Sequence, residues 1–269
     1  MGQIFYIPHG GGPLPLLGDP GYARLSMMLR SLNPKIAGCK AIILVTAHWE
    51  GEQPRLSSAS HPELLYDYYG FPDAAYQLTY AAPGAPELAE AVKNKLVTKG
   101  FDPTLDPDRG FDHGTFVPMT LIRSEADIPI LQMSLLSSLD PVQHLLMGKA
   151  IAELLQQEIV LIGSGFSFHN IAALTGRMAD ELSEAQALAE DFHSWLDDVI
   201  CDPDLQPKQR EQSLISWADA PGARFCHPRE EHLLPLHVCC GAALESGVAA
   251  HRIFSEPVKG FQTSGYHWH

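Results

Sequence analysis

Four short apolar segments, separated by longer stretches with helical periodicity, constrain the fold more than any other feature of this 269-residue chain. Each has the length and the continuous apolar character of a strand buried on both faces, and they span residues 4–7, 41–46, 128–133 and 159–162. Helical patterns lie between and after them, at 21–32, 86–99, 141–155 and 179–200. This alternation predicts a single α/β domain over residues 1–269, with a mixed or mostly parallel central sheet flanked by helices on both faces.

Histidines stand at the ends of three of these predicted strands. His9 follows the first strand, His48 follows the second, and His169 lies just beyond the strand that ends near Gly163. In an open α/β sheet, ligands bind at the carboxyl ends of the strands. Imidazole is the commonest metal ligand of proteins and the usual proton carrier near neutral pH. We therefore expect these three histidines to converge on one site.

Composition excludes several classes of partner. The chain has 18 Lys and Arg against 32 Asp and Glu, and binding to nucleic acid depends on neutralising phosphates with basic residues, so we expect no nucleic-acid partner. Without a basic leader or an apolar stretch of ~18 to 20 residues, we expect a cytoplasmic protein that does not bind membranes. The five cysteines show no C-x-x-C spacing and are expected to be reduced. Residues 201–223 are polar, so we expect them to form a long excursion on the surface of the domain. The sequence does not determine the oligomeric state.

Two glycine-containing motifs surround histidines. In Pro8-His9-Gly10-Gly11-Gly12-Pro13, the glycines let the backbone turn sharply and approach a ligand, and the Lys-Ser/Thr of a phosphate-binding loop is missing. In Gly110-Phe111-Asp112-His113-Gly114-Thr115, a histidine beside a carboxylate suits a proton donor or acceptor. The alternative for the second motif is an ordinary helix start capped by Asp112 or Thr115.

Other motifs favour less specific interpretations. Gly163-Ser164-Gly165 does not match G-x-S-x-G, which argues against a serine hydrolase. The segment 227–237 is expected to begin a helix and lacks the H-E-x-x-H of zinc proteases. The terminal segment 266–269 either covers the site or docks against the core. Four further histidines lie in polar or helical-surface contexts and are expected to bind no metal: His61, His144, His193 and His251.

Taken in order, the motifs resemble those of the class III extradiol ring-cleavage dioxygenases, the LigB-type superfamily, and its single-chain 4,5-DOPA-dioxygenase-like branch. The resemblance runs nearly end to end. It rests on P-H-G-G-G-P at 8–13, A-H-W at 47–49, Y-G-F-P at 69–72, Y-x-A-P-G-x-P at 80–86, F-D-H-G at 111–114, G-S-G-x-x-x-H-N at 163–170 and H-P-x-x-E-H-x-x-P at 227–235.

The resemblance implies specific roles for these residues. His9, His48 and His232 would bind the metal, with His169 as a fourth ligand or a close neighbour. His113 would be the acid/base histidine, and His169 would also contact the reacting groups. Two-component members use a glutamate as third ligand, so Glu231 beside His232 remains an alternative. Tyr69 and Phe71, with Tyr66, are candidates for lining the substrate pocket, although aromatic residues there are equally consistent with the core.

The implied activity is extradiol cleavage of a catechol-type ring with O₂. Fe(II) is expected for activity, and Zn²⁺ is the alternative occupant of purified protein because divalent affinities rank it above Fe²⁺. A second hypothesis is a mononuclear zinc hydrolase, since a histidine-rich site with an open position activates water. A third is a non-enzymatic, metal-binding relative of the same fold. The presence of His113 beside the expected ligands weighs against that third hypothesis.

Overall fold

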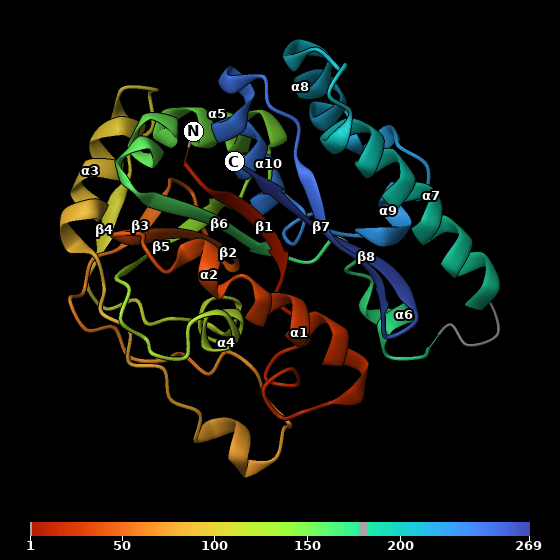
Figure 1. Cartoon of the computed structure of the whole chain (residues 1–269), viewed down its shortest axis with the longest axis horizontal. Helices are drawn as coiled ribbons and strands as arrows, with labels where there is room; N and C mark the ends of the chain where they lie inside the picture. The colour runs from red at the N-terminus through yellow and green to blue at the C-terminus, as the bar shows by residue number, and fades with distance from the viewer. Residues whose placement is uncertain (1, 178–181) are drawn as a thin grey trace.

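An eight-stranded mixed sheet forms the centre of the computed structural model, which describes residues 2–177 and 182–269 (Figure 1). The strand order is β4-β3-β5-β2-β6-β1-β8-β7, and the middle four strands, β5, β2, β6 and β1, are parallel. The strands are β1 (Ile4–Pro8), β2 (Ala41–Gly51), β3 (Arg55–Ser57), β4 (Thr104–Asp106), β5 (Ile130–Leu136), β6 (Ile159–Gly165), β7 (His251–Val258) and β8 (Phe261–Trp268). The four parallel strands are the four predicted from apolar runs, which confirms the predicted fold class.

The outer strands of the sheet were not predicted from the sequence, because their segments lack continuous apolar runs. Strands β3 and β4 have three residues each, and β7 is exposed or half-buried along most of its length. The terminal segment forms β8, which pairs antiparallel with β1, so it docks in the sheet and does not cover the predicted site. His267 stacks on Phe5 near the start of β1, about 13 Å along the strand from His9 at ~3.3 Å per residue.

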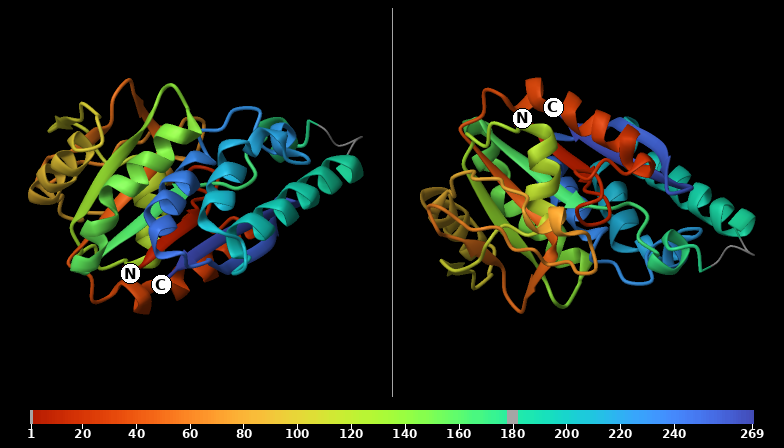
Figure 2. Two further views of the ribbon diagram at one scale, coloured as in Figure 1. Left: turned by 90° about the horizontal axis from the view of Figure 1, so that it is seen from above. Right: turned by 90° about the horizontal axis from the view of Figure 1, so that it is seen from below.

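Helices cover both faces of the sheet. Figure 1 shows α5 and α10 on one side and α1, α2 and α4 on the other, and Figure 2 shows α7 running beside the β7–β8 hairpin. The helices are α1 (Ala23–Ser31), α2 (Asn33–Ile36), α3 (Pro86–Val97), α4 (His113–Ile122), α5 (Pro141–Ile151), α6 (Ile171–Leu174), α7 (Leu182–Cys201), α8 (Pro207–Ile215), α9 (Ala223–Cys226) and α10 (Leu234–Ala243). Helices α1, α3, α5 and α7 correspond to the four predicted helical patterns, and the start of the fourth pattern, 179–181, lies outside the described residues. Within the described ranges, no helix is long and apolar enough to cross a membrane.

One sequence expectation about the second half is wrong, and another is confirmed with a later start. Residues 201–223 contain α8 and a short 3₁₀ helix, Trp217–Asp219, and they bury Leu214 and Trp217. The Arg210 guanidinium is also buried and donates to the Val199 carbonyl at 2.8 Å. This segment therefore packs into the domain, because its few apolar residues share one side of a mostly polar helix. The helix expected at 227–237 begins only at Leu234.

Helix α4 is almost wholly buried and carries a proline in its interior, Pro118. Because proline has no backbone N–H, the Gly114 carbonyl four residues earlier loses its partner within the helix. The Ser164 hydroxyl of β6 donates to that carbonyl instead. The serine that sits between two glycines therefore satisfies a buried backbone group and ties the start of α4 to the sheet.

Replacing Ser164 by alanine is expected to lower the free energy of unfolding by about 1–3 kcal/mol, since it leaves the buried Gly114 carbonyl unsatisfied. Urea denaturation would measure the loss. The exposed Ser137, in the loop after β5, offers a matched control whose alanine variant should change stability by less than ~0.5 kcal/mol. Equal stability of the two variants would show that another group satisfies the Gly114 carbonyl.

Candidate metal centre

Three imidazoles meet at the carboxyl ends of the parallel strands. The Nε2 atom of His48 lies 3.2 Å from Nε2 of His9 and 3.3 Å from Nε2 of His232. His9 follows β1, His48 lies within β2, and His232 precedes α10. The rings of His9 and His232 are buried, and the His48 side chain is only 20% exposed. We call these three residues the histidine triad.

The spacing of the triad suits one metal ion. Three nitrogens that bind an ion at ~2.1 Å lie about 3.0–3.4 Å apart in octahedral or tetrahedral geometry. Burial, together with the neighbouring imidazoles, lowers the pKa of His9, His48 and His232 well below the usual histidine value. The rings are therefore neutral near pH 7, which is the form that binds metals. The residues present fit a divalent ion with nitrogen ligands.

Grouping the possible metal-ligand atoms by their mutual distances gives a different division of these residues. Oxygen and nitrogen atoms within 4.8 Å of one another define two sets, His9 with His48 and His113, and His169 with Glu231 and His232. Both short nitrogen pairs involve His48: the pair with His9 lies within the first set, and the pair with His232 joins the two sets. We therefore take the triad as the candidate metal site, because the ligand atoms of one ion lie close to one another.

His48 reaches the triad from an irregular part of β2. The strand continues to Gly51, past its predicted end at Thr46, and its pairing with β5 shifts between Val45 and Glu50. Such an irregularity re-aims side chains at the edge of a site. Gly114 in α4 is equally necessary here, because a Cβ atom at that position would lie 3.0 Å from the His48 ring.

The backbone of His232 is held against the ends of β1 and β6. Its carbonyl accepts hydrogen bonds from the Tyr6 hydroxyl at 2.9 Å and from the Phe166 amide at 3.0 Å. A side chain at Gly165 would collide with this carbonyl, since its Cβ would lie 2.2 Å away. The G-S-G motif therefore lets the segment that carries His232 approach the sheet.

His113 is the first residue of α4 and lies beside the triad, with its ring centroid 3.9 Å from that of His48. Its backbone N–H and its Nδ1 both contact the Asp67 carboxylate, at 3.0 and 2.8 Å. Burial alone would raise the pKa of Asp67, but the hydrogen bond and charge of His113 outweigh it and leave the pKa lowered. Asp67 was missed in the sequence, because a lone aspartate between two tyrosines in a loop carries no signal.

Asp112 was the sequence candidate for orienting His113, and it has a different task. Its carboxylate caps α4 by accepting from the Thr115 N–H, and it accepts from Thr46 at 2.8 Å and from Arg109 at 2.8 Å. The helix-cap interpretation is therefore confirmed for Asp112, and His113, as the first residue of the helix, lies beside the histidine triad.

His169 and Glu231 lie on the other side of His232. The rings of His169 and His232 are stacked, with centroids 3.3 Å apart and planes at 19°. The Glu231 Oε1 atom lies 2.9 Å from His232 Nδ1 and 3.2 Å from His169 Nδ1. Glu231 thus contacts the edge of His232 that faces away from the triad, which does not suit a third metal ligand.

The two aromatic residues expected near the substrate, Tyr69 and Phe71, lie in different environments in the structure. Tyr69 is 92% exposed, whereas its neighbour Tyr68 lies toward His113, with ring centroids 5.9 Å apart. Phe71 packs on Tyr68 and close to Gly12 of the P-H-G-G-G-P loop. Tyr68 and Phe71 therefore lie on the side of the histidines while Tyr69 faces solvent, and the left-handed Gly70 (φ 78°) turns the backbone between Tyr69 and Phe71.

Two of the four histidines set aside in the sequence are core residues, not surface ones. His144 is buried, and its Nε2 accepts from the Leu136 N–H at 3.1 Å. His193 is buried against the Ser167 hydroxyl at 2.9 Å. Neither belongs to the two ligand groups found in the described part of the chain.

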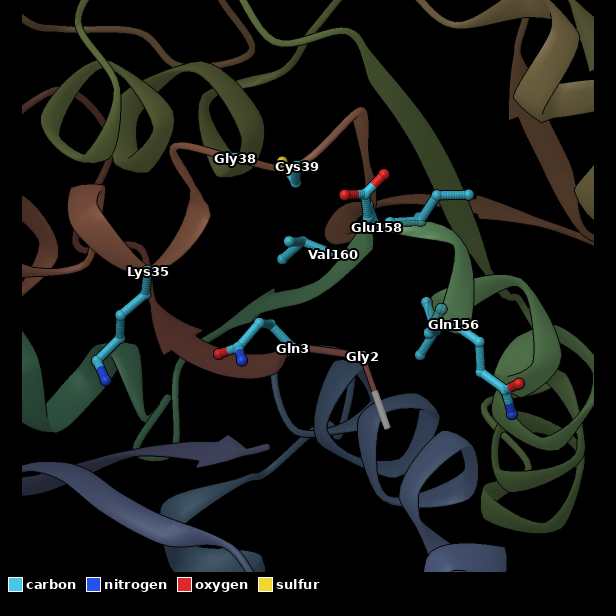
Figure 3. A pocket seen from close by; sticks show the side chains of 10 residues that line it. Gly2, Gln3, Lys35, Gly38, Cys39, Gln156, Glu158 and Val160 are labelled. Atoms are coloured by element: carbon cyan, nitrogen blue, oxygen red, sulfur yellow. The ribbon is translucent and has the colours of Figure 1, made fainter.

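A surface pocket lies at the opposite end of the sheet from the histidines. It has a volume of about 650 Å³ and opens where β1 and β6 begin, and Figure 3 shows Gln3, Lys35 and Glu158 around it. Ligands of open α/β sheets bind at the carboxyl ends of the strands. The chemistry of the histidines therefore lies away from this cavity.

Comparison with known proteins gives consistent matches. A family model described as the catalytic LigB subunit of aromatic ring-opening dioxygenase matches residues 17–263. The dioxygenase tasH of Hapsidospora irregularis is 42% identical, over 100% of this chain and 86% of its own length. A 4,5-DOPA dioxygenase extradiol of Beta vulgaris is 35% identical, over 92% and 89%. The crystal structure of an uncharacterized protein from Escherichia coli K12 superposes with a TM-score of 0.73 at 24% identity, covering 99% of both chains, and supports the fold.

Proposed function

The chain belongs to the LigB family of aromatic ring-opening dioxygenases and is an extradiol dioxygenase, and we propose that it opens a catechol ring at a metal bound by His9, His48 and His232. The observation that carries the proposal is the approach of the three Nε2 atoms, at 3.2 and 3.3 Å, beside two further histidines. In this proposal residues 1–269 form one catalytic domain, and Fe(II) is the active metal.

Fe(II), when bound, would supply redox coupling between the catecholate oxygens and O₂. His9, His48 and His232 would hold the ion and would leave positions on it open to the catechol oxygens and O₂. His169 is therefore proposed to stay beside the metal and contact substrate or oxygen, because a fourth permanent ligand would remove one of these positions.

His113 is proposed as the acid/base residue. Asp67 accepts a hydrogen bond from Nδ1 of His113, so Nε2 is the ring nitrogen left to exchange a proton with the substrate. That nitrogen can take the proton of the second catechol hydroxyl and later return it to an oxygen of the product. The ring is only 8% exposed, which limits exchange of this proton with bulk water. Tyr68 and Phe71 are proposed to bound the substrate pocket on this side.

One assay tests the proposal. The protein is loaded with Fe(II) without oxygen and then mixed with O₂ and a panel of small catechols, while O₂ uptake and the absorbance of a yellow ring-opened product are followed. Uptake of one O₂ per catechol opened is the expected result. Full iron loading without O₂ uptake on any catechol would contradict the proposal.

Zinc-loaded protein is expected to be inactive toward the same catechols, because Zn²⁺ cannot change oxidation state. The comparison needs the same preparation loaded in parallel with Fe(II) and Zn²⁺, and metal content measured by elemental analysis. Ring opening that persists after rigorous removal of iron would contradict the assignment of iron as the active metal, and ester hydrolysis by the zinc form would favour a zinc hydrolase.

A further inference from the structure

Glu231 makes an unusual pair of contacts next to the proposed metal site. One carboxylate oxygen, Oε1, lies within hydrogen-bond distance of Nδ1 of both His232 and His169. The two residues belong to different segments: His169 follows β6, and His232 precedes α10. Their rings lie face to face, so a single acceptor reaches both Nδ1 edges.

These contacts select one tautomer for each ring. A carboxylate only accepts hydrogen bonds, so Nδ1 of His232 must carry the proton that it donates to Oε1, and we infer the same for Nδ1 of His169, which lies 3.2 Å from that oxygen. In the neutral rings, both Nε2 atoms then carry a free lone pair. For His232 this lone pair faces Nε2 of His48 at 3.3 Å, where a cation between the two nitrogens relieves their repulsion.

The carboxylate itself is held in place. Arg229 lies 3.3 Å from its second oxygen, Oε2, and also binds Glu50 at 2.7 Å. Only 12% of the Glu231 side chain is exposed, so its carboxylate is shielded from most of the solvent.

We propose that Glu231 is a positioning residue whose single oxygen orients both the ligand His232 and its neighbour His169, an inference that rests on the proposed metal site and deepens it. Carboxylates that accept the outer N–H of a ligating histidine raise its basicity and set the ring orientation. Here the same oxygen also makes His169 present an unprotonated Nε2 toward the substrate side. The site then has a carboxylate–imidazole pair on each flank, Asp67–His113 and Glu231–His169.

Glu231→Gln and Glu231→Ala test this role. The amide oxygen of glutamine is an uncharged and weaker acceptor at the same place, and alanine has no acceptor there. We expect affinity for Zn²⁺, measured by competition with a chromogenic chelator, to fall by about 10- to 100-fold in the alanine variant and by less in the glutamine variant. The adjacent Glu230 is a matched control: it pairs with Arg224 near the surface, so Glu230→Gln should bind Zn²⁺ like the wild type.

A second measurement detects the Nδ1 protons of His169 and His232 directly. In zinc-loaded wild-type protein with ¹⁵N-labelled histidine, NMR should detect slowly exchanging Nδ1 protons on His169 and His232, and both signals should shift or vanish in Glu231→Ala. Thermal melting of each apoprotein shows whether the variants fold. Unchanged zinc affinity and unchanged Nδ1 signals in a folded Glu231→Ala protein would overturn the proposal.

Two further outcomes distinguish the positioning role of Glu231 from the proposed function. Loss of zinc binding in Glu231→Gln as complete as in a triad variant would make the carboxylate a metal ligand and would also overturn the positioning role. A wild-type protein that opens no catechol, yet loses zinc affinity and Nδ1 signals in Glu231→Ala, would contradict the proposed function while supporting the positioning role.

Discussion

Replacing His48 by alanine is expected to weaken metal binding by roughly 10²- to 10⁴-fold. A protein zinc site contributes about 10–16 kcal/mol, so one of three ligands corresponds to about 3–5 kcal/mol, and each 1.4 kcal/mol is tenfold in affinity. His48 is the most informative member of the triad because its Nε2 has short contacts with both other ligands. His9→Ala and His232→Ala should behave similarly. Equilibrium dialysis with Zn²⁺ or Fe(II), followed by elemental analysis, measures the effect.

His61→Ala is the matched control for the triad. His61 is exposed and contacts the Ser60 hydroxyl, away from the parallel strand ends, so its loss should leave metal affinity unchanged. Stoichiometric, tight metal binding in His48→Ala would mean that the triad is not the metal site. The second ligand-type group, His169 with Glu231 and His232, would then be the place to search.

Replacing His113 by alanine should keep the metal and reduce turnover by about 10²- to 10⁴-fold, the usual contribution of positioned acid/base catalysis. His113 comes from α4 and binds Asp67 through Nδ1, so its removal takes no nitrogen from the triad. Because the lost step is proton transfer, kcat and kcat/KM should fall together with little change in KM, provided that chemistry is slower than substrate release. Iron content and single-turnover rates on one preparation check this.

Asp67→Asn refines the test of His113. The amide keeps the size of the side chain but removes the negative charge that holds the Nδ1 proton, so an intermediate loss of turnover is expected. If His113 only begins a helix, its alanine variant would show a modestly lower melting temperature and normal activity per folded, iron-loaded molecule. Wild-type turnover in His113→Ala would transfer the acid/base role to His169.

Local sequence patterns were sufficient to predict the central strands of the sheet. Strands buried on both faces must be apolar throughout, so β1, β2, β5 and β6 are visible as unbroken runs. The edge strands are not, because strands of three residues or with one exposed face leave no such pattern. Residues 201–223 were misjudged for a related reason: a polar composition hides the two side chains, Leu214 and Trp217, that dock this segment on the core.

The histidines at strand ends were visible in the sequence because parallel strands bring their carboxyl ends to one edge, which is a property of the topology and not of any single residue. The partners of those histidines were not visible. Asp67 lies far from His113 along the chain, and nothing local marks it as the residue that fixes the ring.

Glu231 is a second residue whose role could not be predicted from the sequence. Its place beside His232 in the sequence made it an alternative ligand, and only the packing of the β6 loop against the turn before α10 places its oxygen between two Nδ1 atoms. The sequence by itself determined which four strands form the centre of the sheet and that His9 and His48 stand at the ends of two of them, because burial and periodicity are local properties. Tertiary structure alone decided which nitrogen of each histidine faces its neighbours and which carboxylate supports it, because a hydrogen bond depends on distances between segments that the chain order does not specify.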